Sequence, residues 1–171
     1  MTGSPIEVRT ATLADLPRLL EIYNHYVVHT PVTFDIEPLT LEQRRSWFDQ
    51  HQDHGRHRLL IAEDSGRVVG YASSHQFRVK AAYDSTVETT VYLDPNFTRR
   101  GIGAALYEAL FDALRGEDIA SYVAAITLPN EGSLALHARF GFTPVGTLHR
   151  VGRKFDAYWD VGWFERVLDR A

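Results

Sequence analysis

The feature that most constrains this chain is a pair of glycines at the expected start of a helix. The run RRGIGA, residues 99–104, follows a β-like segment and a loop, and it opens into amphipathic sequence that extends to about Leu114. A helix N-terminus offers unpaired backbone N–H groups and the positive end of the helix dipole, which favours a phosphate. Glycine at 101 and 103 removes the Cβ atoms that would hold an anion away from the backbone. The turn therefore predicts that the chain holds a pyrophosphate.

Two nucleotide-binding motifs with similar glycines do not fit the sequence. A Walker P-loop needs Gly, four residues and then Gly-Lys-Ser/Thr, and no such run occurs. In a dinucleotide-binding fingerprint the third glycine would fall at position 106, which is Leu106, and the turn would follow the first strand rather than the fourth. A tight turn that uses glycine for packing remains the alternative.

Composition excludes several function classes. A length of 171 residues suits one domain with a full core, expected over 1–171 with its core at about 6–168. A net charge of −4 gives no basic footprint for nucleic acid, and the absence of Cys removes disulfides and thiolate chemistry. The N-terminus lacks a signal-peptide pattern, and no apolar run is long enough to span a bilayer. We therefore expect a cytoplasmic protein without a membrane or nucleic-acid partner.

Hydrophobic periodicity predicts a mixed α/β fold. The expected elements, in chain order, are a strand at 6–9, a helix at 12–29, a connector at 31–38, a helix at 40–52, strands at 58–63 and 68–72, a strand ending at 93, a helix at 101–114, a strand at 121–127, a helix at 134–140 and two strands within 144–168. Thr40 and Gln43 form a capping-box pattern at the start of the second helix. Arg44, Arg45 and Asp49 of that helix are expected to face solvent.

Two longer segments carry a family resemblance. VYLDPNFTRRGIGAALYEAL at 91–110 and LPNEGSLALHARFGFTPVG at 128–146, in this order of elements, resemble the GNAT superfamily of N-acetyltransferases. The resemblance spans 6–168. It implies one α/β (α+β) domain with a mixed, mostly antiparallel sheet of six or seven strands, flanked by about four helices. It also implies acetyl-CoA as cosubstrate, with its pyrophosphate on the glycine turn.

The resemblance assigns cofactor contacts residue by residue. Thr98 stands where the superfamily has Gln or Arg, so one side-chain contact is expected to be absent while the backbone contacts remain. The cofactor-binding residues that it implies are Val91, Tyr92, Leu93, Arg99, Arg100, Gly101, Ile102, Gly103, Ala104, Asn130 and Ser133.

Shorter motifs are similar to one branch of the superfamily. YNHY at 23–26, AYD at 82–84, the E-x-T-V-Y pattern at 88–92 and the YW-x-DVG pattern at 158–162 resemble the phosphinothricin and methionine-sulfoximine N-acetyltransferases. That branch implies acetylation of the α-amino group of a small amino-acid-like substrate, by direct attack on the thioester, in a homodimer. The implied substrate-binding residues are Phe34, Arg78, Val79, Lys80, Tyr83, Glu88, Thr89 and Thr90.

Two residues are candidates for proton transfer. Glu88, near the start of the strand that leads to the glycine turn, is the expected general base, and a solvated carboxylate is the alternative. His137 stands where many superfamily members have a Tyr that protonates the leaving thiolate. It is expected either to donate that proton or order water, or to be a histidine satisfied at the pocket edge. The scattered histidines predict no metal site.

Two other functions stay open. In the first, the chain is an enzyme that acetylates another amine, such as a protein N-terminus, an aminoglycoside or a polyamine. In the second, it is a non-catalytic acyl-CoA-binding sensor. Arg78 and Lys80 favour an anionic substrate, because guanidinium and ammonium groups bind carboxylates and related oxyanions. The presence of Glu88 disfavours the sensor.

Overall fold

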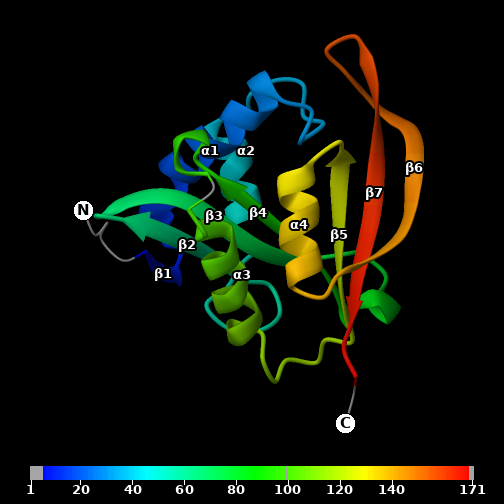
Figure 1. Cartoon of the computed structure of the whole chain (residues 1–171). Coiled ribbons are helices and arrows are strands. Elements are labelled where there is room, and N and C mark those ends of the chain that lie inside the picture. Colours follow the sequence, from blue (N-terminus) through cyan, green and yellow to red (C-terminus); the bar gives the residue numbers. More distant parts are fainter. Residues whose placement is uncertain (1–5, 99, 170–171) are drawn as a thin grey trace. The chain divides into compact units, whose positions relative to one another are not determined.

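The computed structural model describes residues 6–98 and 100–169 (Figure 1). Within this part of the chain the strands and α-helices are β1 (Glu7–Thr10), α1 (Leu16–His29), α2 (Leu41–Phe48), β2 (Leu59–Asp64), β3 (Arg67–Gln76), β4 (Thr86–Leu93), α3 (Ile102–Ala113), β5 (Ser121–Leu128), α4 (Glu131–Arg139), β6 (Thr143–Lys154) and β7 (Ala157–Val167). The sheet has seven strands in the order β1-β2-β3-β4-β5-β7-β6. Pairing is antiparallel in β1–β2, β2–β3, β5–β7 and β6–β7, and parallel in β4–β5. The predicted fold class is confirmed.

The chain divides into two compact units, which share strand β4. Unit 1 contains the described residues up to 23, together with 39–75 and 89–118, and unit 2 contains 24–38, 76–88 and the described residues from 119 onward. The chain passes from unit 2 to unit 1 between Glu88 and Thr89, inside β4. The domain boundaries expected from the sequence stay a prediction.

The core of unit 1 lies between α3 and the strands β2 and β3. Ile102, Leu106 and Leu110 of α3 are at most 1% exposed and recur at helical spacing, so one face of the helix is apolar. Residues 59–62 of β2 are all buried, and α3 packs against this strand. This packing fixes the N-terminal end of α3, where the glycine turn begins.

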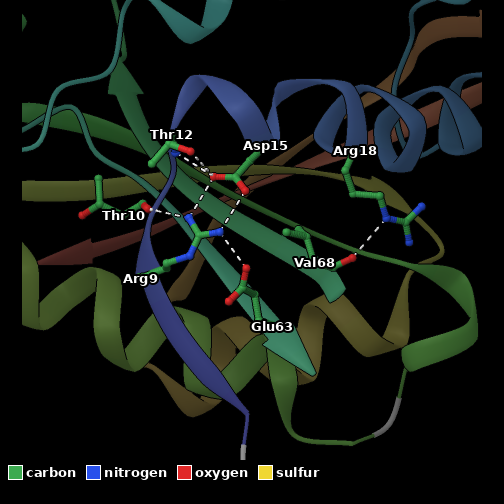
Figure 2. Close-up of polar contacts among 7 residues, drawn as sticks. All are labelled: Arg9, Thr10, Thr12, Asp15, Arg18, Glu63 and Val68. Carbon is green, nitrogen blue, oxygen red and sulfur yellow. Dashed lines mark hydrogen bonds and ion pairs between the residues drawn. The ribbon is translucent and has the colours of Figure 1, made fainter. Parts of the chain in front are cut away.

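A polar network in unit 1 joins β1 to β2 (Figure 2). Arg9 donates two hydrogen bonds to Asp15, at 2.8 and 2.9 Å, and a third to Glu63 at 2.6 Å. The Thr12 N–H donates to the Asp15 carboxylate at 2.7 Å, as in a capping box at the start of the short 3-10 helix η1 (Leu13–Asp15) that precedes α1. The hydrogen bonds from Arg9 lower the pKa of Asp15, so this carboxylate is ionised at neutral pH.

Helix α2 differs from its prediction in two ways. Its capping box is confirmed, with the Gln43 N–H donating to Thr40 at 3.3 Å, but the helix ends at Phe48 rather than near Gln52. The Gln52 N–H instead donates to the carbonyl of His57 at 2.9 Å, which turns the chain toward β2.

The expected exposure of Arg44 is wrong. Arg44 is 5% exposed, and its guanidinium donates to the Tyr71 hydroxyl at 2.8 Å. Its charge lies 3.4 Å from the centre of the Trp47 ring and 4.2 Å from that of Tyr23. Aromatic faces attract a cation, so they stabilise the charge in the interior. Arg45 and Asp49 are exposed as expected and form an ion pair at 2.7 Å.

Unit 2 is built around the long β6–β7 hairpin, drawn in orange and red in Figure 1. Strand β7 pairs with β5 from Ser121↔Val167 to Leu128↔Asp160. Helix α4 begins at Glu131, three residues before the expected start, because Asn130 caps it: the Ser133 N–H donates to Asn130 Oδ1 at 3.1 Å. Gly141, at φ +81°, follows the helix as expected of a C-terminal glycine.

Candidate active site

The glycine turn in unit 1 has the geometry of an anion site. Gly101 is the N-cap of α3 and has φ +77°, a conformation that favours glycine. Among the residues that the structure describes, no side chain caps the helix and no acidic residue lies in its first turn, so the first backbone N–H groups are left for another acceptor. A Cβ built on Gly101 meets nothing within 4 Å, which places open space beside the turn. These features fit a phosphate group.

The side chains around the turn divide into core and surface. Ile102 is 1% exposed and Gly103 is buried, so this part of the turn offers backbone rather than side chains. The Arg100 guanidinium contacts the carboxylate of Asp64 at 2.8 Å. Arg99, which was also expected to bind cofactor, lies outside the described residues.

Strand β4 carries the expected base. Its parallel pairing with β5 runs from Thr86↔Ser121 to Glu88↔Val123, and β4 itself continues to Leu93. Glu88 therefore stands at the last position paired with β5. Burial raises the pKa of its carboxyl group. A raised pKa makes the carboxylate a stronger proton acceptor than one in water, which suits a general base.

The residues that follow Glu88 on β4 lie in different surroundings. Thr89 is 2% exposed and the Tyr107 hydroxyl of α3 donates to it at 3.4 Å, so its side chain is part of the unit 1 core rather than of a substrate surface. The hydroxyl groups of Thr90 and Ser73 are 3.0 Å apart. Val91, Tyr92 and Leu93 are half-buried, and the ring of Tyr92 stacks on that of Tyr71 at 5.5 Å.

Helix α4 of unit 2 brings Asn130, Ser133 and His137 into one network. His137 is 3% exposed, and its Nδ1 lies 2.7 Å from the carbonyl oxygen of Ser133. That distance requires Nδ1 to carry a proton and donate it to the carbonyl. Burial lowers the pKa of the imidazole, so the ring is neutral at pH 7. A proton donor here would have to be the imidazolium, whose formation the lowered pKa opposes.

Phe34, from the expected substrate set, packs within unit 2 against the β6–β7 hairpin. A Cβ on Gly152 would come within 2.2 Å of the Phe34 ring, so only glycine leaves space for the aromatic side chain. Next to it, the Lys154 ammonium donates to the Thr33 carbonyl at 2.8 Å and is 4% exposed. The sequence reasoning missed Gly152 and Lys154, although a glycine inside a strand indicates a close approach.

The other expected substrate residues lie on the loop between β3 and β4. Arg78 is exposed, and its guanidinium lies 5.0 Å from the ring centre of Phe77 and 5.7 Å from that of Tyr83. Val79 is 88% exposed and Tyr83 40% exposed. In the described part of the chain, no carboxylate lies within ion-pair distance of Arg78 or Lys80. Arg78 and Lys80 are both exposed.

The structure thus sorts the expected residues by unit. Unit 2 contains Glu88, Phe34, the loop bearing Arg78 and Lys80, and the α4 network, whereas unit 1 contains the glycine turn and residues 89–93 of β4. Residues 6–98 and 100–169 contain no group of three or more His, Asp or Glu side chains arranged to hold a metal ion. No helix in the same residues is both long and apolar enough to cross a bilayer.

The family model and the sequence relatives that match this chain are all acetyltransferases. The family model described as "Acetyltransferase (GNAT) domain" matches residues 8–163. The chain is 52% identical over 165 residues to a phosphinothricin N-acetyltransferase of Streptomyces coelicolor, covering 95% of this chain and 96% of the relative. It is 35% identical over 162 residues to an L-methionine sulfoximine/L-methionine sulfone acetyltransferase of Pseudomonas paraeruginosa, covering 95% and 94%.

A solved structure agrees with the sequence relatives. The GNAT superfamily phosphinothricin acetyltransferase of Sinorhizobium meliloti, solved in complex with AcCoA, matches with a TM-score of 0.90 and 30% sequence identity. The match covers 95% of this chain and 88% of that one. The chain therefore belongs to the GNAT family of acetyltransferases and is an N-acetyltransferase enzyme.

Proposed function

We propose that this enzyme transfers the acetyl group of acetyl-CoA to the α-amino group of a small amino-acid-like substrate of the phosphinothricin or methionine-sulfoximine type. The observation that carries the proposal is the position of Glu88: a carboxyl group whose pKa is raised by burial stands on the strand that leads into the glycine turn. The relatives named for these substrates, at 52% and 35% identity, support the same substrate class.

Acetyl-CoA binds to the glycine turn and to strand β4. The backbone N–H groups at the start of α3 donate hydrogen bonds to the pyrophosphate, with Arg100 and Ala104 beside them, and Thr98 contributes no long side chain. Backbone groups of Val91, Tyr92 and Leu93 align the acyl-bearing arm, and the N–H of Tyr92 polarises the carbonyl. Asn130 and Ser133, at the start of α4, complete the set of cofactor-binding residues that the family resemblance implies. When bound, acetyl-CoA supplies an acetyl group activated as a thioester.

Glu88 removes the proton that the amine must lose. An α-amino group with a pKa of about 8 is roughly 10% neutral at pH 7, so the base needs to provide only modest help. The amine nitrogen forms a bond to the carbonyl carbon as the carbon–sulfur bond breaks, and the sulfur leaves with the electron pair. The amine proton passes to the Glu88 carboxylate directly or through a water, and the thiolate then takes up a proton. His137, neutral and bonded to Ser133, orders this region rather than donating that proton.

The substrate anion binds on the loop before β4. Arg78 and Lys80 supply the positive charge for a carboxylate or phosphinate. The other side chains of the proposed substrate set are Val79, Tyr83, Phe34 and Thr90. Thr89 contributes through its backbone, because its side chain is buried.

A thiol-release assay with acetyl-CoA and a panel of amines tests the proposal. We expect turnover with phosphinothricin, methionine sulfoximine or methionine sulfone, and a raised KM for these acceptors in Arg78→Met and Lys80→Met. Turnover confined to a peptide N-terminus, an aminoglycoside or a polyamine would show that the proposed substrate class is wrong and that the enzyme acts on that other amine. Tight CoA binding without turnover on any amine would instead identify an acyl-CoA sensor.

The proposal includes a homodimer formed through β6 and β7. Strand β6 is the last strand in the sheet order, and its side chains at Val145, Leu148 and Val151 are 49–60% exposed. An apolar edge strand of this length is a template for association. Sedimentation velocity at micromolar concentration should give a dimer, and Leu148→Lys should shift it toward the monomer. A monomeric wild type at all concentrations would remove this part of the proposal.

A further inference from the structure

The β2–β3 hairpin contacts the connection that carries the glycine turn at two points. Its turn is Asp64-Ser65-Gly66-Arg67, with Asp64 paired to Arg67 and positive φ at the two central residues, as in a two-residue hairpin turn. Asp64 Oδ2 contacts Arg100 Nη1 at 2.8 Å, immediately before Gly101. Arg67 Nη2 contacts Asp94 Oδ2 at 3.0 Å, immediately after β4. One hairpin turn therefore holds both ends of residues 94–100.

The two ion pairs are linked through one aromatic ring. The guanidinium carbon of Arg67 lies 5.4 Å from the centre of the Phe97 ring, and that of Arg100 lies 5.3 Å from the same centre. Phe97 ends the short 3-10 helix η3 (Pro95–Phe97), which lies midway between the two anchored ends. Each guanidinium thus contacts a carboxylate and this ring, so the middle of the connection is held along with its ends.

Of the two carboxylates in these ion pairs, Asp94, the partner of Arg67, is the more deeply buried. Asp94 is 2% exposed and accepts from the backbone and side-chain nitrogens of Asn96 at 2.9 and 3.0 Å. It also accepts from Arg18 of α1, whose Nε donates to the carbonyl of Val68 at 3.1 Å. The Asp94 N–H donates to the carbonyl of Val69 at 2.8 Å. The strand exit is therefore fixed by several bonds, whereas the far end is held by the ion pair between Asp64 and Arg100.

We propose that the hairpin turn 64–67 is a positioning element for the acyl-CoA pyrophosphate, and that Asp64 acts by holding Arg100 so that the backbone N–H groups after Gly101 are aimed before the cofactor binds. This inference rests on the proposed function of the glycine turn. Ordering a loop on binding costs affinity, and a loop that is already held avoids that cost. Asp64 is thus a positioning residue that touches neither substrate nor cofactor.

The opposite role makes a different prediction. If Asp64 merely competes with phosphate for the Arg100 guanidinium, removing its charge releases Arg100 to the cofactor and lowers the KM for acetyl-CoA. If Asp64 positions the turn, the same change raises that KM. The sign of one measurement therefore separates the two roles.

The test compares Asp64→Asn, Arg100→Met and the double variant by steady-state kinetics and by calorimetric titration with CoA. We expect the KM for acetyl-CoA and the Kd for CoA to rise roughly three- to tenfold in each single variant, with kcat within about twofold of wild type. Because Asp64 and Arg100 act as one pair, the KM and Kd of the double variant should not exceed those of the weaker-binding single variant. Asp49→Asn is the matched control: it breaks an Asp–Arg pair of 2.7 Å in the same unit, away from the turn, and should leave both constants unchanged.

The outcomes separate this inference from the proposed function. If wild type does not bind CoA, the proposed function of the turn fails. If wild type binds CoA and Asp64→Asn binds it equally or more tightly, the positioning role is overturned while the proposed function stands. Should Asp64→Asn be poorly folded by circular dichroism, Arg67→Met provides the second variant, because Arg18 and Asn96 still hold Asp94. In Arg67→Met, a rise of the KM for acetyl-CoA that is smaller than the roughly three- to tenfold rise expected for Asp64→Asn supports the proposal, and an unchanged KM contradicts it.

Discussion

The guanidinium carbon of Arg44 lies 3.4 Å from the centre of the Trp47 ring, one helical turn further along α2. The same guanidinium donates to Tyr71 O–H, and Tyr71 in turn stacks on Tyr92 of β4. Tyr23 closes the group, with its ring 5.3 Å from that of Tyr92. Arg44 therefore joins α2 to β3 and β4 through aromatic contacts. Its charge is stabilised by ring faces.

Arg44→Ala should destabilise the protein by about 2–4 kcal/mol, because it removes a buried stem, the cation–ring contacts and the partner of the Tyr71 hydroxyl. Arg45→Ala is the matched control, since it makes the same change in the same helix at an exposed residue, and it should cost less than about 1 kcal/mol. Urea unfolding of both variants measures the difference. Equal losses in the two would mean that the aromatic group contributes nothing specific.

The error at Arg44 shows what the sequence could and could not predict. Helix and strand positions followed from periodicity and capping residues, and the structure confirms them to within a few residues. The polar run Glu-Gln-Arg-Arg at 42–45 suggests a solvated face. A signal was nevertheless present, because Arg44, Trp47 and Phe48 share one helix face at spacings of three and four. Long-range partners such as Tyr71 decide burial, and local pattern does not contain them.

Glu88→Gln should reduce kcat by roughly 10²- to 10⁴-fold, the range for loss of a general base. The wild-type rate should rise with pH as the carboxyl group ionises, with a midpoint above the ordinary glutamate value because burial raises its pKa. The variant should lose this acidic limb while its Kd for CoA stays close to wild type. A pH–rate profile from 4.5 to 9 checks this, and a wild-type-like profile in the variant would exclude Glu88 from proton transfer.

The reaction should not depend on an imidazolium at position 137. His137→Ala should lower the free energy of unfolding by about 1–3 kcal/mol, because it removes a buried ring bonded to the Ser133 carbonyl. We expect kcat to fall less than about tenfold, since solvent reprotonates the thiolate. A loss of kcat beyond a hundredfold, together with the loss of an alkaline limb in the pH profile, would establish His137 as the proton donor instead.

The site was less predictable than the fold, and for a physical reason. The glycine turn depends on local backbone geometry, so its αL residue and helix start could be inferred from sequence. The surroundings of Thr89 could not, because alternation on β4 leaves open which face meets α3; Tyr107 settles it. Likewise, the contact of Phe34 with Gly152 joins residues more than a hundred positions apart. The partner of Arg100 at Asp64 is equally non-local.

Gly101→Ala should weaken cofactor binding through the backbone alone. The position has φ +77°, where a Cβ costs about 1 kcal/mol, although the added atom itself meets nothing within 4 Å. Strain relief would move the N–H groups at the start of α3. We expect the Kd for CoA to rise, whereas Gly116→Ala, at φ +87° and also with open space, should affect stability alone. Calorimetric titration of both variants with CoA distinguishes a role in binding from a general cost of strain.

Stability should fall as pH drops from about 6.5 toward 4, because two half-buried histidines resist protonation. Burial, with a contribution from neighbouring histidines, lowers the pKa of His51 and of His75 to about 4. The unfolded chain binds these protons near pH 6.5 and the folded chain does not, so acid favours unfolding by on the order of 2 kcal/mol per histidine at pH 5. Glu88 acts in the opposite sense, since its pKa is raised in the folded state.

Urea midpoints between pH 4.5 and 7.5 measure this dependence. His75→Gln should flatten it, because glutamine does not titrate, whereas His54→Gln, at a side chain 81% exposed, should leave the slope unchanged. The pKa values of Asp15 and Asp94 are lowered in the folded state, so both ionised carboxylates stabilise the protein at neutral pH. That stabilisation is lost only at a more acidic pH than the one at which the histidines begin to favour unfolding. A wild-type midpoint that stays constant from pH 7 to 5 would contradict the burial of both imidazoles in their neutral form.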